Sequence, residues 1–241
     1  MLKQEDYTHH ISAQFNSELE GLRNQILEMG GKVERQLADA LAALTAMDSG
    51  QAEAVIAKDE DVNQLEMLID DQCSSILARR QPAASDLRLV VAIIKVNRDL
   101  ERIGDEASKV ARQAMRLSEA SSASPSNFVE IRHIGNHVAS LLRRVLDAFA
   151  RLDVDSAVSV VKNDSIVDEE YGSALRSLMT FMMEDPRAIS GIMNEIWALK
   201  SLERVGDHAS NIAEQIIYLV RGLDVRHGRL EELADQVQKL E

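Results

Sequence analysis

The sequence predicts an all-α protein built as two tandem three-helix bundles, with six long helices related by an internal duplication. The composition favours helices over strands, because there are only three prolines, eleven glycines and 3% aromatic residues. Nearly the same line also occurs twice, 102 residues apart: ERIGDEASKVARQ begins at Glu101 and ERVGDHASNIAEQ begins at Glu203. A repeated line with its Glu, Gly and Asp in register indicates two equivalent halves.

The first half of the chain reads as three helices separated by short breaks. Helical periodicity runs from near Ile11 to DSG at 48–50, where Asp and Ser can cap a helix and Gly can end one. A second helix is expected from about Gln51 to Arg80, because Pro82 cannot continue the hydrogen-bond ladder. A third helix is expected from about Ala83 to Leu117, which completes one bundle.

The second half repeats this plan after a short polar segment. SEASSASPSN at 118–127 consists almost entirely of turn and linker residues. Helices are expected at about 128–151, 157–183 and 187–220, with breaks at LDVDS and EDP between them. The predicted domains are a first three-helix bundle at 1–120, a linker at 121–126, a second three-helix bundle at 127–222 and a charged C-terminal tail at 223–241.

Charge and cysteine content limit where the protein works and what it contacts. A formal net charge of −13 argues against nucleic acid or an anionic membrane surface as a partner, because both attract basic patches. Cys73 is the single cysteine, so it cannot form an internal disulfide, and no signal-peptide pattern is present. No apolar run approaches the ~20 residues that span a bilayer. We therefore expect a cytoplasmic protein without direct membrane insertion.

An apolar stripe in the third helix marks the core. Its residues recur at alternating steps of three and four, the spacing of a seam packed against two other helices: Ile93, Val96, Leu100, Ile103, Ala107, Val110, Ala114 and Leu117. The sixth helix repeats this stripe except at its first position: Glu195, Ala198, Leu202, Val205, Ala209, Ile212, Ile216 and Leu219. Trp197 and the Met-rich LMTFMM at 178–183 also fall on helices and are interpreted as core residues.

Beside this stripe, each half carries a pair of carboxylates on one helical face. Glu101 and Asp105 stand four residues apart, which places both on a face well to the side of the apolar stripe. Glu203 and Asp207 repeat the arrangement. Carboxylates stacked in this way repel each other, more strongly when they are partly desolvated. A compensating positive charge is therefore expected.

Arginine is the ordinary source of that charge. Arg98, Arg102 and Arg204 are close in sequence, and ion pairs around a helical bundle are common. Gly104 and Gly206 then serve only as points where two helices touch. A metal ion is the other source.

The preceding helix of each half favours the metal. Asp59 and Asn63 are spaced four apart, and Asp164 and Asp168 repeat this spacing. The two helices of each half are expected to be adjacent and antiparallel. Oxygen ligands that converge from two helices are how bundles hold metal ions, and a nearly all-oxygen set favours iron, manganese, magnesium or calcium.

Catalytic motifs are otherwise missing from the chain. It has no glycine-rich phosphate loop, nucleophile elbow or cysteine cluster, so we do not expect an enzyme. Glu130 with His133 is the only match to the Glu-x-x-His pair of di-iron bundles and lacks a partner motif, so it is interpreted as chance. His208 points away from the carboxylate face and is interpreted as a surface residue.

Three stretches together resemble the PhoU family: the duplicated ERIGD and ERVGD, the opening HHISAQFNSELEGLR at 9–23 and the hairpin ARRQPAASDLR at 78–88. The likeness runs in order over nearly the whole chain. It implies two tandem three-helix bundles in a cytoplasmic protein that is usually a homodimer and binds metal clusters through E/D-x-x-x-D motifs. Those motifs fall on Glu101 with Asp105, Glu203 with Asp207, Asp59 with Asn63 and Asp164 with Asp168.

The resemblance also implies a regulatory function. It points to a non-enzymatic negative regulator of phosphate uptake and of the phosphate-starvation response. Its partners would be the ATPase subunit of a phosphate ABC transporter and a phosphate sensor histidine kinase.

Two departures from a perfect duplication matter. Asn63 stands where the other pairs have a carboxylate, so the first half's site is expected to be weaker or to hold fewer metals. The basic hairpin occurs in the first half only, and its candidate partner contacts are Arg79, Arg80, Asp86 and Arg88. Two other functions stay open from the sequence: an oxygen-ligated metalloenzyme, and a plain helical scaffold whose carboxylate pairs are solvated faces.

Overall fold

A computed structural model describes residues 13–119 and 128–225. Over these ranges the chain forms six long α-helices and one short 3-10 turn, η2, at Pro186–Ala188. The helices are α1 (Ala13–Ala46), α2 (Ser49–Arg80), α3 (Ala84–Glu119), α4 (Val129–Arg151), α5 (Val154–Glu184) and α6 (Ile189–Arg221). The all-α prediction and its six helices are confirmed. The predicted linker at 121–126 and the tail from 226 onward lie outside the described residues.

Two of the helices begin earlier than the sequence pattern predicts, because an aspartate caps each of them. The Asp48 side chain accepts a hydrogen bond from the backbone N–H of Gln51, and α2 begins at Ser49. Asp153 accepts from the backbone N–H groups of Asp155 and Ser156, and α5 begins at Val154. Each cap satisfies backbone donors that the first turn of a helix leaves free.

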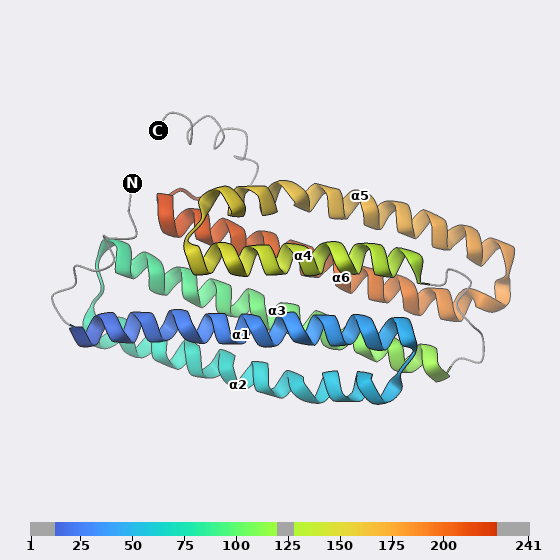
Figure 1. The fold of residues 1–241 in the computed structure, drawn as a ribbon, viewed down its shortest axis with the longest axis horizontal. Coiled ribbons are helices and arrows are strands. Elements are labelled where there is room, and N and C mark those ends of the chain that lie inside the picture. The colour runs from blue at the N-terminus through green and yellow to red at the C-terminus, as the bar shows by residue number, and fades with distance from the viewer. Residues whose placement is uncertain (1–12, 120–127, 226–241) are drawn as a thin grey trace.

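The six helices form two groups that lie side by side along the long axis of the molecule (Figure 1). α1, α2 and α3 pack together in one group, and α4, α5 and α6 in the other. The groups meet where α3 packs along α6 and α1 packs against α4. The two duplicated helices α3 and α6 therefore share the centre of the molecule.

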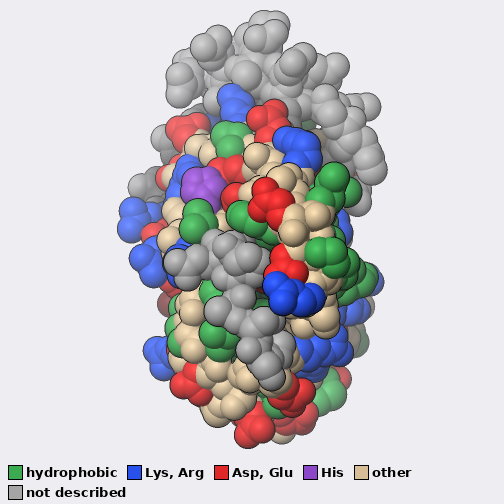
Figure 2. All heavy atoms as spheres, turned by 90° about the vertical axis from the view of Figure 1, so that its right-hand side faces the viewer, with side chains coloured by type: hydrophobic (Ala, Val, Ile, Leu, Met, Phe, Trp, Pro, Cys, Tyr) green, Lys and Arg blue, Asp and Glu red, His purple; other side chains and the backbone are tan. Residues whose placement is uncertain are grey.

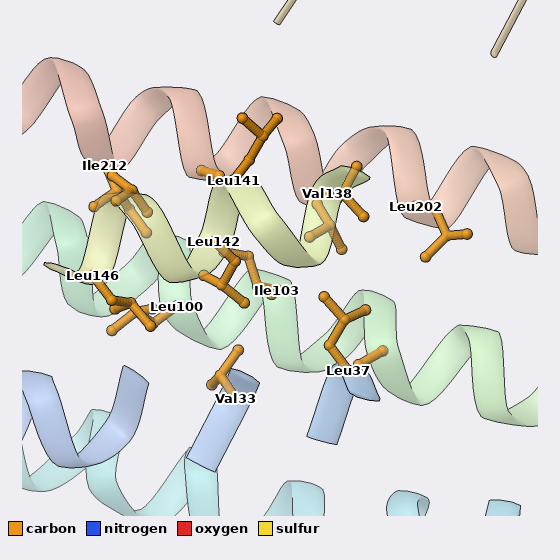
Figure 3. Packing of buried hydrophobic residues seen from close by; sticks show 14 of the residues in the cluster. Val33, Leu37, Leu100, Ile103, Val138, Leu141, Leu142, Leu146, Leu202 and Ile212 are labelled. Carbon is orange, nitrogen blue, oxygen red and sulfur yellow. The ribbon is translucent and has the colours of Figure 1, made fainter. Parts of the chain in front are cut away.

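A continuous hydrophobic core connects the two groups. Figure 3 shows Val33 and Leu37 of α1 together with Leu100 and Ile103 of α3, near side chains of α4 and α6. Every residue of the two predicted stripes is at most 3% exposed, including Glu195, whose carboxyl group is buried at the position equivalent to Ile93. The predicted seams are thus the contact faces of α3 and α6.

The contact between α1 and α4 relies on two glycines. A Cβ atom at Gly30 of α1 would overlap the Leu146 side chain of α4, and a Cβ at Gly135 of α4 would overlap Leu41 of α1. Each helix therefore inserts a leucine where the other has no side chain, which brings the two backbones close.

The core interpretation of Trp197 and part of the Met-rich stretch is wrong. Trp197 is 55% exposed and Met183 is 84% exposed, whereas Leu178 is buried. The cause is the helical face: Trp197 lies in line with exposed Ile189 and Met193 of α6, and Met183 in line with exposed Met179 of α5, away from the buried residues of each helix. The α5–α6 end also extends beyond the shorter α4 (Figure 1).

None of the helices in the described part of the chain has both the length and the apolar composition needed to cross a membrane.

Candidate metal centre

The second half brings three predicted ligands together between α5 and α6. Asp168, Glu203 and Asp207 each present a carboxylate oxygen, and these three atoms all lie within 4.8 Å of one another. Glu203 is buried, whereas Asp168 is exposed. Within residues 13–119 and 128–225, this is the one group of three His, Cys, Asp or Glu side chains with such convergence. We call it the second-half cluster, together with Asp164.

Burial and the neighbouring negative charges make Asp164 and Asp207 hard to ionise. The pKa of Asp164 rises to about 6, first because the group is desolvated and then because Asp207, Asp168 and Glu203 are negatively charged. The pKa of Asp207 also rises, through desolvation and the charges of Glu203 and Asp168. A divalent cation would relieve this repulsion, because it favours the charged form of every ligand.

Lys200 supplies part of the compensating charge, and the sequence pattern did not single it out. Its Nζ lies 2.7 Å from the Glu203 carboxylate, one turn earlier on α6. The ammonium also lies 5.4 Å from the centre of the Tyr171 ring of α5. Any cation that binds Glu203 must compete with Lys200 for that carboxylate.

The first half arranges its ligands differently. Arg102 lies close to both carboxylates of the ERIGD motif, with its Nε 3.4 Å from Glu101 Oε2 and its Nη1 3.4 Å from Asp105 Oδ2. Glu101 Oε2 is buried and accepts no hydrogen bond among the described residues. On α2, Asp59 Oδ1 accepts a 2.9 Å hydrogen bond from Gln36 Nε2 of α1. We call the predicted ligands Glu101, Asp105, Asp59 and Asn63 the first-half cluster. Among the described residues, no three carboxylates of this half bring oxygen atoms within 4.8 Å of one another.

Glu66 is an additional carboxylate of the first-half cluster. Desolvation raises its pKa, and Asp70 and Asp105 raise it further. The pKa of Glu101 is raised by desolvation and by Asp105, and Glu66 and Asp59 contribute smaller effects. The sequence offered a signal for Glu66, because it lies seven residues after Asp59, two turns along the same helical face.

Both glycines of the repeated motif sit where helices approach closely. A Cβ atom at Gly104 would lie 3.2 Å from Gln36 Oε1 and 3.4 Å from Asp59 Oδ1. A Cβ at Gly206 would lie 3.3 Å from Val167 Cγ1 of α5. The glycines therefore hold the carboxylate-bearing helices near each other, as the close-packing interpretation predicts.

The basic hairpin is largely engaged within the chain. Arg80 makes two hydrogen bonds to the Glu18 carboxylate of α1, at 3.0 and 2.6 Å. Asp86 is 9% exposed, and Arg88 is half-buried with its Nε inaccessible. Arg79 is the member of the predicted set that remains exposed.

His208 is not the surface residue that the sequence suggested. Its side chain is only 16% exposed, and its Nδ1 lies 2.9 Å from Asp99 Oδ1 of α3. The contact links α6 to α3, so the residue joins the two halves of the molecule. Glu130 and His133, interpreted above as a chance match, do not enter either carboxylate cluster.

Comparisons with known proteins agree with this duplicated architecture. The family model described as the PhoU domain matches twice, at residues 26–114 and 131–216. The chain is 58% identical over 238 residues to the phosphate-specific transport system accessory protein PhoU homolog of Pseudomonas aeruginosa, covering 99% of this chain and 98% of that protein. It is 47% identical over 224 residues to the phosphate-specific transport system accessory protein PhoU of Escherichia coli K12, covering 93% and 92%.

Solved structures show the same fold. The crystal structure of PhoU from Pseudomonas aeruginosa aligns with a TM-score of 0.84 and 59% identity, over 87% of this chain and all of that one. The phosphate transport system regulatory protein PhoU from Streptococcus pneumoniae aligns with a TM-score of 0.80 and 30% identity, over 88% and 100%. The expectation of a non-enzymatic protein agrees with relatives that are named as accessory and regulatory proteins. The chain belongs to the PhoU family.

Proposed function

We propose that this protein is a non-enzymatic regulator that restrains phosphate uptake and the phosphate-starvation response. In this role it links the ATPase subunit of a phosphate ABC transporter to a phosphate sensor histidine kinase in the cytoplasm. The observation that carries the proposal is 58% identity, over 99% of the chain, to a protein named as an accessory of phosphate-specific transport.

The proposed regulator holds a metal ion through oxygen ligands. The second-half cluster fits such an ion best, because three carboxylate oxygens lie within 4.8 Å of one another and the donor set is hard. Asp164, Asp168, Glu203 and Asp207 would hold it there. In the first half Glu101, Asp105, Asp59 and Asn63 would form a second, weaker site. The ion would supply positive charge that cancels the carboxylate repulsion, and iron, manganese, magnesium and calcium all suit oxygen ligands.

An exposed apolar strip supports contact with another protein. Five large apolar residues of the α5–α6 end are exposed by between 37% and 84%: Met179, Met183, Ile189, Met193 and Trp197. Figure 2 views this end of the molecule and shows hydrophobic side chains along one flank. Contiguous exposed apolar residues with an aromatic member are typical of protein interfaces. The strip is the proposed surface for a homodimer or for docking on the transporter, and exposed Arg79 is a further candidate contact.

A bacterial strain that lacks its own PhoU provides the test. A phosphate-starvation reporter should be expressed constitutively in that strain, and this protein should silence it when phosphate is plentiful. A variant with Glu101, Asp105, Glu203 and Asp207 all changed to Ala should fail to silence it. The matched control changes the exposed carboxylates Glu60 and Glu169 of the same bundles to Gln and should silence the reporter fully.

Bound metal is measured on the same proteins, purified without chelator or nickel, by plasma mass spectrometry. Metal in the wild type and the control but not in the quadruple variant supports a metal-dependent regulator. Full silencing by a quadruple variant that carries no metal would instead mean that the carboxylate pairs are solvated faces. Failure of the wild type to silence the reporter would contradict the regulatory proposal.

A further inference from the structure

Between α3 and α6 the surface contains a hollow of about 540 Å³ that is lined by basic side chains. Lys95, Arg98 and Arg102 line it from α3, and Arg204 lines it from α6. This concentration of positive charge stands out in a chain whose formal net charge is −13. We call it the basic hollow.

The two acids of the basic hollow already have partners. Asp99 Oδ1 lies 2.9 Å from His208 Nδ1 and accepts a 3.3 Å hydrogen bond from Asn211 Nδ2. Glu214 also takes part in an interaction within the chain. These contacts hold the acids in place, and the four cations of the lining still outnumber the two acids.

The cations, in contrast, retain unused donors. Arg98 is exposed and makes no hydrogen bond or ion pair with residues that the structure describes. Arg204 uses Nη1 for the buried Glu106, at 2.9 Å, and that acid is also held by Lys109. A guanidinium group has five N–H donors, so most of those on Arg98 and Arg204 remain available.

A buried amide, that of Gln215, lies in the wall of the basic hollow. Gln215 lines it and is only 6% exposed, and its Oε1 accepts no hydrogen bond among the described residues. A buried acceptor left without a partner is costly, and a ligand donor that reached this amide would satisfy it. The basic hollow thus combines arginine side chains, which can bind an anion, with the amide of Gln215 in its wall.

We propose that the basic hollow binds a small molecule that carries phosphate. Guanidinium groups match phosphate oxygens in a bidentate manner, and several of them converge here. A volume of about 540 Å³ lies in the range of small-molecule sites and exceeds what orthophosphate alone would fill. A phosphorylated ligand with an additional hydroxyl or amino group would satisfy both the arginines and Gln215. The basic hollow adjoins the first-half cluster, because Arg102 lines the hollow and also contacts Glu101 and Asp105. The proposal does not depend on the proposed regulatory function.

Isothermal titration of the metal-free full chain tests the proposal, with excess EDTA present so that no ion can bridge phosphate to the carboxylate clusters. The probes are inorganic phosphate, pyrophosphate, AMP and ATP at near-physiological salt, because exposed charges are exaggerated at low ionic strength. Arg98→Ala should weaken binding about tenfold or more, since it removes charge-assisted hydrogen bonds. Arg112→Ala removes an exposed arginine of the same helix outside the hollow and should leave binding unchanged.

The probes also separate the possible sources of the phosphate group. Equal affinity for inorganic phosphate and AMP would assign recognition to the phosphate alone. Tighter binding of AMP or ATP, reduced in Gln215→Leu, would assign it to a nucleotide-sized ligand. The proposal is overturned if none of the four probes binds, or if Arg98→Ala binds them as tightly as the wild type. Binding of an acidic peptide such as poly-glutamate without binding of the phosphate probes would also overturn it, in favour of a protein partner.

Discussion

Gln36 Nε2 of α1 donates a 2.9 Å hydrogen bond to Asp59 Oδ1 of α2, and this contact distinguishes the two carboxylate clusters. The same amide also donates to the backbone oxygen of Gly104 and to Ser108 Oγ. A neutral donor from a third helix therefore partly satisfies the first-half cluster. Each cluster also has a neighbouring cation, Arg102 in the first half and Lys200 in the second, so the amide donor is what the second half lacks among the contacts of its described residues.

This difference predicts that the two clusters bind metal with unequal affinity. Titration of the metal-free protein with Mn²⁺ should show a tighter phase that disappears in the double variant Glu203→Ala, Asp207→Ala. It should also show a weaker phase that disappears in the double variant Glu101→Ala, Asp105→Ala. The reason is that three ligand oxygens already converge in the second half, whereas the first half has the neutral amide of Asn63 where the other pairs have a carboxylate.

Asn63→Asp should strengthen the weaker phase, by about tenfold, because each added carboxylate increases the attraction for a divalent cation. Gln64→Glu places the same negative charge on the next residue of α2, which is exposed, and serves as the control. Equal strengthening by both variants would show that overall charge, and not ligation, determines the affinity.

The raised pKa of Asp164 predicts how the metal-free protein responds to pH. Its pKa is about 6 in the folded state and ordinarily near 3.8, so the folded protein holds the proton more tightly than the unfolded chain. The contribution of Asp164 to stability is therefore fully present below about pH 3.8 and is lost as pH rises through about 6.

Asp164→Asn removes this titration while it keeps the shape of the side chain. In EDTA, urea unfolding should find the variant more stable than the wild type at pH 7.5 by about 1 kcal/mol, a value reduced for partial solvent screening. Near pH 4 the two proteins should differ little. With saturating Mn²⁺ the order should reverse, because the variant loses a ligand; an unchanged order would remove Asp164 from the metal site.

The helices and their core were predictable because they depend on local periodicity. The stripes of α3 and α6 are read from steps of three and four residues, and every position in them is buried. The pairing of Glu203 with Asp207 is equally local, since four residues make about one turn. Asp168 could be added to this pair, because the helix before each repeated motif carries two oxygen-bearing side chains four residues apart.

Other features depend on contacts that the sequence does not encode locally. Gln36 carries no motif, and only the packing of α1 against α2 brings it to Asp59. Lys200 lies three residues before Glu203, so that contact is local, whereas its contact with the Tyr171 ring depends on the packing of α5. Trp197 shares a helical face with exposed Ile189 and Met193, at steps of four residues, and lies off the buried stripe, so its exposure could have been read from the same periodicity.

Cys73 should be unreactive in the folded protein. It is fully buried, and burial, followed by the charge of Asp70, raises the pKa of its thiol to about 12. Almost no thiolate is present at neutral pH. A thiol reagent should label the native chain only as fast as it unfolds, and labelling should become rapid and stoichiometric in strong denaturant. Fast labelling without denaturant would show that α2 opens locally.

Adjacent glycines of α1 should respond oppositely to the same substitution. Gly31 is exposed, and a Cβ atom there meets no atom within 4 Å. Gly31→Ala should therefore stabilise the protein by about 0.5 to 1 kcal/mol, because alanine forms helix more readily. Gly30→Ala gains the same propensity, but its Cβ would overlap Leu146 in the contact between α1 and α4. Overpacking costs about 1 to 3 kcal/mol, so this variant should be less stable than Gly31→Ala by at least about 1 kcal/mol.

Urea unfolding of both variants measures this difference, and a double-mutant cycle identifies its source. Leu146→Ala alone should destabilise the protein, because it empties part of the core between α1 and α4. Combined with Gly30→Ala it should cost less than the sum of the two single changes, since the new methyl group occupies space that the leucine has left. Strict additivity would mean that Leu146 moves aside without cost, and the reciprocal insertion of leucines would then not hold α1 against α4.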